Sequence, residues 1–250
     1  MAVARPTARF HHGQPLLVVV FLILVPPLLL HGSSPPELSC SWRDREIRID
    51  GDDEDWRDLT RPVAGQKFAM GLLNDAEALY LCLVTKDRAT SAQITRQGLI
   101  LWFSRPDDRK HGFGVQFPFD GAGPMPGRPA GREALGIFGP GRKDVRRVPM
   151  EEAGGIVACV GVHGDLVVYE ARLPIKAGGG EYAVAAEPGG NVRLELMTPE
   201  WRGPLPRARS PIGFGVAGGP GPGGMVGYPL VDAAMLRPLD VAATLRLASR

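Results

Sequence analysis

Histidine and cysteine, which carry much of the nucleophilic and metal chemistry of proteins, are scarce in this sequence. Its 250 residues include five histidines and three cysteines. The sequence also lacks the G-x-S-x-G, H-E-x-x-H and C-x-x-C motifs of serine hydrolases, zinc peptidases and dithiol oxidoreductases. Catalytic triads form in space, but no spacing around His111 or His163 indicates one. We therefore predict a protein that is not an enzyme.

An excess of charge of one sign is missing as well. The chain has 29 Lys and Arg and 27 Asp and Glu. Residues 1–34 hold two of the arginines and no acidic residue, so the remaining chain balances 27 basic against 27 acidic residues. A nucleic-acid-binding surface requires a basic patch or stripe. We therefore expect no nucleic-acid partner.

The N-terminal segment has the order of a secretory signal. Arg5 and Arg9 precede an uncharged apolar run, Pro15–Leu30, and small polar residues follow it. The run is 16 residues long and contains two prolines, whereas a helix needs about 20 apolar residues to cross a bilayer. We predict a signal peptide over residues 1–34 and export to the periplasm or the cell exterior.

Two kinds of membrane attachment remain open, and both would involve only the N-terminal part of the chain. An uncleaved apolar run would act as an anchor. Cys40 would accept a lipid, although nine residues separate it from the apolar run and Glu37 stands where a lipoprotein signal has an aliphatic residue. Beyond the signal peptide we expect a linker over residues 35–44 and one domain over residues 45–250.

Short apolar or alternating stretches recur along that domain, with turn-forming residues between them. Glycine (33) and proline (24) are abundant, which favours turns over long helices. No long amphipathic helix is apparent, so we predict an all-β fold, an antiparallel β-sandwich or jelly roll. Two Gly/Pro-rich insertions, residues 120–132 and 212–229, are expected to be long surface loops. The predicted strands cover residues 68–72, 79–85, 99–103, 112–117, 156–162, 166–173, 192–196 and 243–247.

Two of the three cysteines, Cys82 and Cys159, lie in strand-like runs. An oxidising compartment would allow a disulfide between them. Two buried free thiols, behaving as small apolar residues, fit the same pattern. Both alternatives stay open at this point.

An acidic turn opens the domain in the stretch EIRIDGDDEDWRDL, residues 46–59. Apolar alternation before the turn predicts a short strand, and we expect Trp56 to fold back onto the edge of the sandwich. Asp52, Asp53 and Asp55 are the oxygen ligands available for calcium, but they lack the D-x-D-x-D-G spacing of a dedicated calcium loop. A solvated turn around a packed tryptophan is the favoured interpretation.

Five local patterns, taken in order, resemble a known family. They are IRIDGDDEDW (47–56), NDAEALYLCLVTKD (74–87), GLILWFS (98–104), HGFGVQFP (111–118) and YEARLPI (169–175). In this order they resemble carbohydrate-binding module family 9, within the DOMON-like superfamily of β-sandwiches, over about residues 45–200. The resemblance implies a β-sandwich that binds a carbohydrate or another cell-envelope ligand without catalysis.

Candidate residues for such binding are aromatic side chains in loops, with polar neighbours. A sugar stacks its apolar face on an aromatic ring and hydrogen-bonds to a few polar groups. Trp201 and Tyr228 lie in loop-like contexts, where an aromatic residue is less readily explained as core. Trp201 is the first candidate, with Arg202 and Glu200 beside it as partners for sugar hydroxyls. Trp102 lies in an apolar strand and fits a core position better, but it is kept as a third aromatic candidate.

Electron transfer and a purely structural role are the alternatives to glycan binding. Some DOMON-like relatives bind haem b through methionine with histidine or lysine, and Met70 with His163 is the available axial pair. Met70 also fits its strand as an ordinary core residue. A scaffold domain in the cell envelope would need no small ligand. Apart from calcium and, in this alternative, haem b, the sequence indicates no cofactor.

Overall fold

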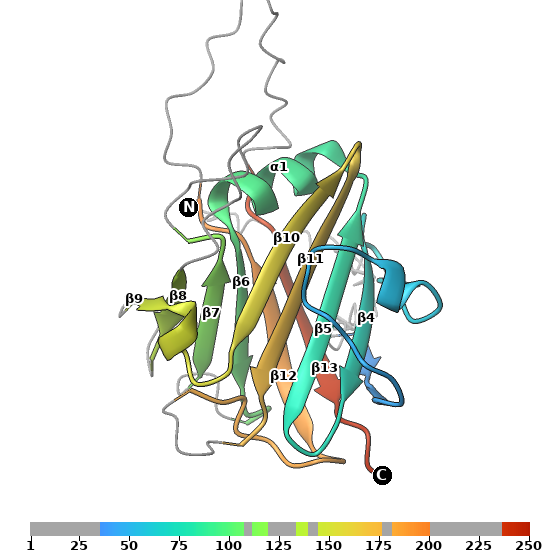
Figure 1. Cartoon of the computed structure of the whole chain (residues 1–250), viewed down its shortest axis with the longest axis vertical. Helices are drawn as coiled ribbons and strands as arrows, with labels where there is room; N and C mark the ends of the chain where they lie inside the picture. Colours follow the sequence, from blue (N-terminus) through green and yellow to red (C-terminus); the bar gives the residue numbers. More distant parts are fainter. Residues whose placement is uncertain (1–35, 108–111, 120–133, 140–144, 177–181, 201–236) are drawn as a thin grey trace, which may run out of the picture. The chain divides into compact units, whose positions relative to one another are not determined.

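Two β-sheets stacked face to face form the fold (Figure 1). The structure is a computed structural model, and it describes residues 36–107, 112–119, 134–139, 145–176, 182–200 and 237–250. Pro35–Arg250 form one compact unit. The predicted all-β sandwich is confirmed, and no helix in the described ranges is long and apolar enough to cross a membrane.

The larger sheet, sheet A, has seven strands in the order β1-β13-β12-β6-β7-β8-β9. Every pairing in it except β1 with β13 is antiparallel. Its strands are β1 (Glu37–Ser39), β6 (Leu99–Ser104), β7 (Phe113–Phe117), β8 (Ala134–Phe138), β9 (Val145–Pro149), β12 (Asn191–Met197) and β13 (Asp240–Arg246).

The smaller sheet, sheet B, runs in the order β10-β11-β5-β4-β2, and β3 also pairs with β4. Its two outermost short strands meet different parts of β4, which leaves an interruption along that edge. The strands are β2 (Ser41–Trp42), β3 (Arg61–Pro62), β4 (Ala69–Asn74), β5 (Ala78–Thr85), β10 (Val157–His163) and β11 (Leu166–Pro174).

The segment before residue 45 is part of the fold, so the prediction of a linker over residues 35–44 is wrong. β1 pairs parallel with β13 in sheet A, and β2 pairs parallel with β4 in sheet B. The chain crosses between the sheets at Cys40, which is buried. Three- and two-residue strands carry too few residues for apolar alternation to be visible, so no pattern in the sequence indicates them.

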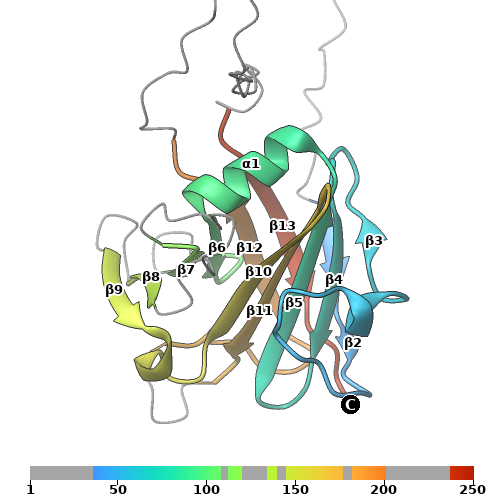
Figure 2. The same ribbon diagram turned by 45° about the horizontal axis from the view of Figure 1, so that its top comes forward.

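One helix, α1 (Arg88–Gln97), was not predicted. It carries the chain from β5 to β6 across one end of the sandwich (Figures 1 and 2). The carboxylate of Asp87 accepts hydrogen bonds from the backbone N–H and the hydroxyl of Thr90, at 3.0 and 2.9 Å, and so caps the first turn. Gly98, at φ 80°, ends the helix. Ile94 packs into the core and anchors the helix there.

The main core lies between the sheets and follows the predicted alternation. In β12, for example, Val192, Leu194 and Leu196 face this core, so the residues between them face outward. A second, smaller core lies on the outer face of sheet B and includes Ile47, Trp56 and Cys82. The second core explains why β4 and β5 are buried on both faces.

Candidate functional site

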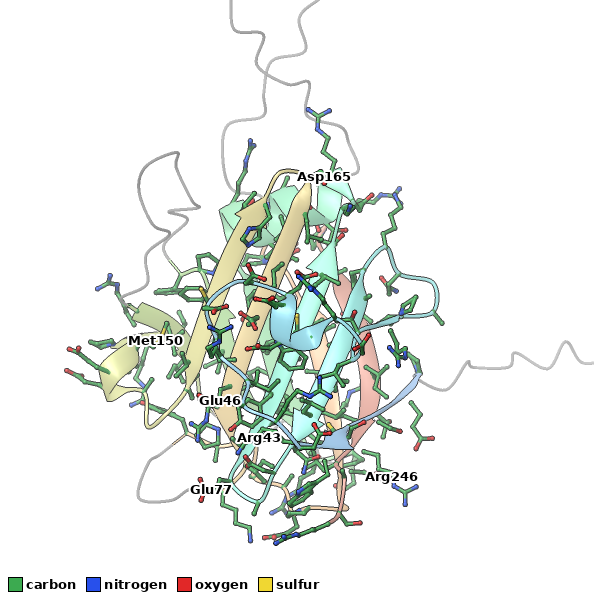
Figure 3. All side chains as sticks on the ribbon, turned by 45° about the vertical axis from the view of Figure 1, so that its right-hand side comes forward. Arg43, Glu46, Glu77, Met150, Asp165 and Arg246 are labelled. Carbon is green, nitrogen blue, oxygen red and sulfur yellow. The ribbon has the colours of Figure 1, made fainter. Side chains whose placement is uncertain are left out.

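The acidic turn at the start of the domain closes over the outer face of sheet B. The segment beginning near Arg43 and Glu46 crosses this face, as Figure 3 shows. Glu170, in the middle of β11, points outward beneath it and is 0% exposed. Its carboxylate accepts hydrogen bonds from Trp56 Nε1 at 2.7 Å, from the Gly51 backbone N–H at 2.6 Å and from the Asp50 backbone N–H at 3.0 Å. We call this arrangement the glutamate clamp.

The clamp explains why the turn has its sequence. Gly51 adopts φ 87°, a conformation that favours glycine, and a side chain there would meet the backbone of Gly161. The Trp56 ring lies against Gly71, where an added methyl group would come within 2.6 Å of Cε3. Burial raises the pKa of Glu170 to about 7, and the N–H donors oppose that shift. The expectation of a turn around a packed tryptophan is therefore met, and the buried acceptor beneath it, Glu170, was not predicted.

The acidic residues of the turn are engaged within it. Asp52 Oδ1 accepts from the Glu54 backbone N–H at 2.9 Å, and Asp55 Oδ2 accepts from the Arg48 backbone N–H at 3.0 Å. Across the described ranges, no group of three or more His, Cys, Asp and Glu side chains is arranged to hold a metal ion. The calcium site considered at Asp52, Asp53 and Asp55 therefore has no support in the geometry.

Cys82 and Cys159 face the same side of sheet B but do not form a disulfide. Glu170 lies between them, opposite Cys159 on one side and opposite Cys82 on the other. Two strand spacings amount to roughly 10 Å, whereas a disulfide needs Cα atoms within about 7 Å. Both cysteines are buried and form no disulfide, and burial raises the pKa of the Cys82 thiol. The alternative without a disulfide is the correct one.

Met70 and His163 cannot share a haem iron. Met70 belongs to the core between the sheets and is 4% exposed. The His163 ring lies on the opposite face of sheet B, where Nε2 is 2.7 Å from the Gly51 carbonyl oxygen. Axial ligands must meet one iron from two sides of the same site. The haem pair considered from the sequence is therefore wrong for this fold.

The outer face of sheet A differs from that of sheet B, which carries the second apolar core, because several of its largely buried side chains are polar. We call the group Trp102, Ser104, Gln116, Arg193 and Glu195 the outer-face cluster. Glu195 on β12 is opposite Trp102 on β6, and Arg193 is opposite Ser104. Residues in such positions have Cβ atoms about 5 Å apart. The register of two antiparallel strands thus brings together residues that are about 90 positions apart in the sequence.

Glycines on the neighbouring strand make room for the Trp102 ring. Gly114 lies opposite Trp102, and a methyl group added there would come within 2.6 Å of Cε3. Gly112 also lies against the indole. The ring is 1% exposed, so Trp102 packs against the sheet, as the sequence favoured, and does not present an open stacking surface.

The cluster's charges form a short internal ion pair. Arg193 Nε donates to Glu195 Oε1 at 2.8 Å, with 13% and 8% of the two side chains exposed. Removing the two charges of a buried pair from water costs free energy that offsets their attraction, so the pair contributes little to net stability. Stability alone therefore does not explain why the pair is present. Ser104 Oγ is buried beside it and has no hydrogen-bond partner among the described residues. Gln116 donates to the Gln97 carbonyl oxygen at 2.8 Å.

The aromatic candidates in the long insertions lie outside the described residues. This applies to Trp201, Arg202 and Tyr228. Glu200, the last described residue before them, is exposed. The structure therefore leaves these four predictions untested as a binding group.

Two described residues outside the insertions lie beside α1. Gly98, which ends α1, lies against the backbone of Pro118, two residues before the first insertion. Gln93 of α1 donates to the carbonyl oxygen of Arg237, eight residues after the second insertion.

The polar members of the cluster were not predicted, although the sequence holds a signal for two of the buried glutamates. Glu195 stands in the middle of an otherwise apolar strand, VRLELM, as Glu170 does in VVYEARLP. A carboxylate in such a position is either paired or hydrogen-bonded, because an isolated buried charge is too costly. Each of the two therefore predicts a specific buried partner, though not which one.

No family model matches the sequence, and no curated protein matches it. Among solved structures, the chain is similar to a family 9 carbohydrate-binding module from Caldicellulosiruptor kristjanssonii in complex with cellotriose, at 11% identity and a TM-score of 0.41, covering 87% of this chain and 95% of that one. The same kind of module in complex with glucose matches at 10% identity and a TM-score of 0.40, covering 86% and 96%. Both are modules of the family that the sequence motifs resemble.

Proposed function

We propose that the chain is a non-catalytic carbohydrate-binding module that contacts sugar hydroxyls through Arg193 and Glu195. The observation that carries the proposal is the ion pair held within the outer face of sheet A, beside an indole and a buried hydroxyl. A guanidinium only donates hydrogen bonds and a carboxylate only accepts them, whereas each sugar hydroxyl does both. A fixed donor–acceptor pair therefore matches two neighbouring hydroxyls.

The pair is also held in place before any ligand arrives. Arg193 and Glu195 are two residues apart on one strand, so both side chains project from the same face. The Arg193 Nη groups donate to no described residue, which leaves them for a ligand. Charge-assisted hydrogen bonds of this kind contribute about 1.5–3 kcal/mol each when formed with neutral partners.

Calorimetric titration with cellotriose and glucose tests the proposal, because these are the sugars named for the two similar modules. Arg193→Lys keeps the charge but loses the planar fork, and Glu195→Gln removes the charge. We expect either change to weaken binding at least tenfold. Arg246→Ala, an exposed arginine on the neighbouring strand β13, is the matched control and should bind like the wild type.

Two results would refute the assignment, once circular dichroism shows that each variant is folded. Neither sugar, nor a wider panel of soluble and insoluble polysaccharides, binds the wild-type protein. Alternatively, a sugar binds and both pair variants retain wild-type affinity. The first result would favour the scaffold role over glycan binding.

A stacking role for Trp201 is a separate part of the proposal. An exposed aromatic ring would add an apolar platform to the polar pair. Trp201→Ala should then weaken sugar binding about tenfold or more, with Trp42→Ala on β2 of sheet B as the aromatic control. Unchanged affinity in Trp201→Ala would remove this residue from the site without touching the ion pair.

Export is proposed on the same footing, from the apolar run before residue 31. Intact-mass measurement of the protein recovered from its native host would locate the mature N-terminus. Cleavage near residue 34 supports a secreted or periplasmic protein, and a lipid mass on Cys40 supports a lipid anchor. A full-length chain in the membrane fraction would indicate an uncleaved anchor instead.

A further inference from the structure

A pocket of about 260 Å³ opens at the edge of sheet B, away from the outer-face cluster. It lies where β4 changes partner. β3 pairs with Ala69 and Met70, and β2 pairs with Leu73 and Asn74. Within the described ranges, the two residues between these pairings have no strand partner on that side. Two residues of strand span about 7 Å, so the interruption is wide enough to admit a narrow side chain or ligand.

The floor of this edge pocket is apolar. Met70, Leu72 and Leu73 of β4 line it, and each is less than a tenth exposed. β3 and β2 frame the two ends, as Figure 2 shows beside β4. An apolar floor beneath a polar mouth matches a chain of a few methylene groups better than a sugar, whose ring carries hydroxyls on its rim.

The rim of the edge pocket is acidic. Glu37 and Asp58 line the opening, both are exposed, and neither forms an ion pair within the described residues. Arg61, the basic residue at the rim, donates through Nη1 to the carbonyl oxygens of Asp58 and Thr60, at 2.8 and 2.9 Å. Its guanidinium is therefore bound to the backbone of the turn, and the two acidic residues lining the opening outnumber the one basic residue.

We propose that the edge pocket binds a primary alkylammonium group, with its aliphatic chain on the floor and its charge at Glu37 and Asp58. The ammonium is a compact charge on an unbranched stem, which suits a narrow apolar notch with acids at its mouth. A lysine side chain of a partner and a free diamine share this chemistry. This proposal does not depend on sugar binding, because the residues involved are different.

The test is calorimetric titration with hexylamine, with hexanol and hexanoate as the neutral and anionic matches. We expect hexylamine to bind one-to-one and hexanoate to show no binding. The double variant Glu37→Gln/Asp58→Asn should weaken hexylamine binding roughly 3- to 10-fold, since both carboxylates are exposed. Asp165→Asn removes one acid at the tip of the β10–β11 hairpin and should leave the affinity unchanged (Figure 3).

A second variant tests access to the pocket independently of charge. Ser39→Phe places a ring at the pocket's mouth from an exposed position on β1 and should abolish hexylamine binding. Arg193→Lys should leave it unchanged, which separates failure of this site from failure of the sugar site. Absence of hexylamine binding, or equal weakening by Asp165→Asn and the double variant, would overturn the proposal.

Two further probes identify the source of the ammonium group. Nα-acetyl-lysine methylamide presents a lysine side chain with peptide bonds on both sides, and 1,5-diaminopentane presents the free diamine. Tighter binding of the lysine derivative supports a protein partner with an exposed lysine. Tighter binding of the diamine supports a small-molecule ligand.

Discussion

The glutamate clamp predicts that the stability of the domain falls as pH rises toward neutrality. Burial raises the pKa of Glu170 from its ordinary value of 4.5 to about 7. The folded protein therefore holds a proton that the unfolded chain releases within this interval. The contribution of Glu170 to the free energy of unfolding is largest below pH 4.5. It decreases between pH 4.5 and about 7 and is constant above that.

The size of the effect follows from the two pKa values. A change of one in pKa corresponds to about 1.4 kcal/mol, so the full difference is worth about 3 kcal/mol. Glu170 is 0% exposed, so solvent does not screen the effect away. The N–H groups of Gly51, Asp50 and Trp56 favour the carboxylate, and the pKa of about 7 already includes this effect, because burial outweighs it.

Glu170→Gln isolates this contribution, because glutamine has the same shape and does not titrate. Urea unfolding, followed by tryptophan fluorescence, would be measured for both proteins between pH 4.5 and 8.5. We expect the wild-type free energy of unfolding, minus that of the variant, to fall by about 2–3 kcal/mol across the range. Glu77→Gln, at an exposed position, is the control and should show a constant difference.

Two outcomes would refute the reasoning about the clamp. A difference that stays constant with pH would mean that Glu170 does not titrate in this range. A difference that rises with pH would mean that the three N–H donors outweigh burial and depress the pKa of the carboxyl. The second result would make the clamp resemble an anion site rather than a buried acid.

Three further predictions concern packing, capping and thiol state. Gly71→Ala should destabilise the domain by about 1–3 kcal/mol, because its methyl group would press on the indole of the clamp, whereas Gly139→Ala has open space and should be neutral in urea unfolding. Asp87→Ala should cost about 1 kcal/mol in the same assay, because it removes the cap of α1, and an unchanged midpoint would contradict the capping role. Iodoacetamide should modify Cys82 and Cys159 only after denaturation and without prior reduction, and an intact mass lower by two hydrogens would reveal a disulfide instead.

The parts of the fold that could be predicted are the strands with a strong apolar pattern. β5, β6, β10, β11 and β12 were expected within one or two residues of their bounds. The missed elements lack that pattern for identifiable reasons. β9 reads VRRVP, an exposed edge strand with two arginines, which protects an edge but leaves no alternation to read. α1 is short and polar, so only its cap and its terminal glycine indicate a helix.

The candidate site shows a different limit. Period-two alternation places Arg193 and Glu195 on one face of a strand, and this much is readable from the sequence. Their neighbours Trp102 and Ser104 come from another strand, and only the register between the two strands brings them together. A one-residue slip would turn every one of these side chains to the opposite face. The cluster is therefore a property of tertiary pairing and not of any local motif.

Glu170 and Glu195 are both buried in strands, but they differ in their hydrogen-bond partners. Both carboxylate oxygens of Glu170 accept hydrogen bonds within the domain. One accepts from two backbone N–H groups of the acidic turn, and the other accepts from the indole N–H of Trp56. Glu195 instead pairs with Arg193, whose Nη groups donate to no described residue. A satisfied acceptor fixes the fold and offers nothing to a ligand, whereas an ion pair with donors to spare can exchange solvent for hydroxyls. That difference, rather than burial or charge alone, is the reason why we propose a sugar site at sheet A and assign the clamp at sheet B to the fold.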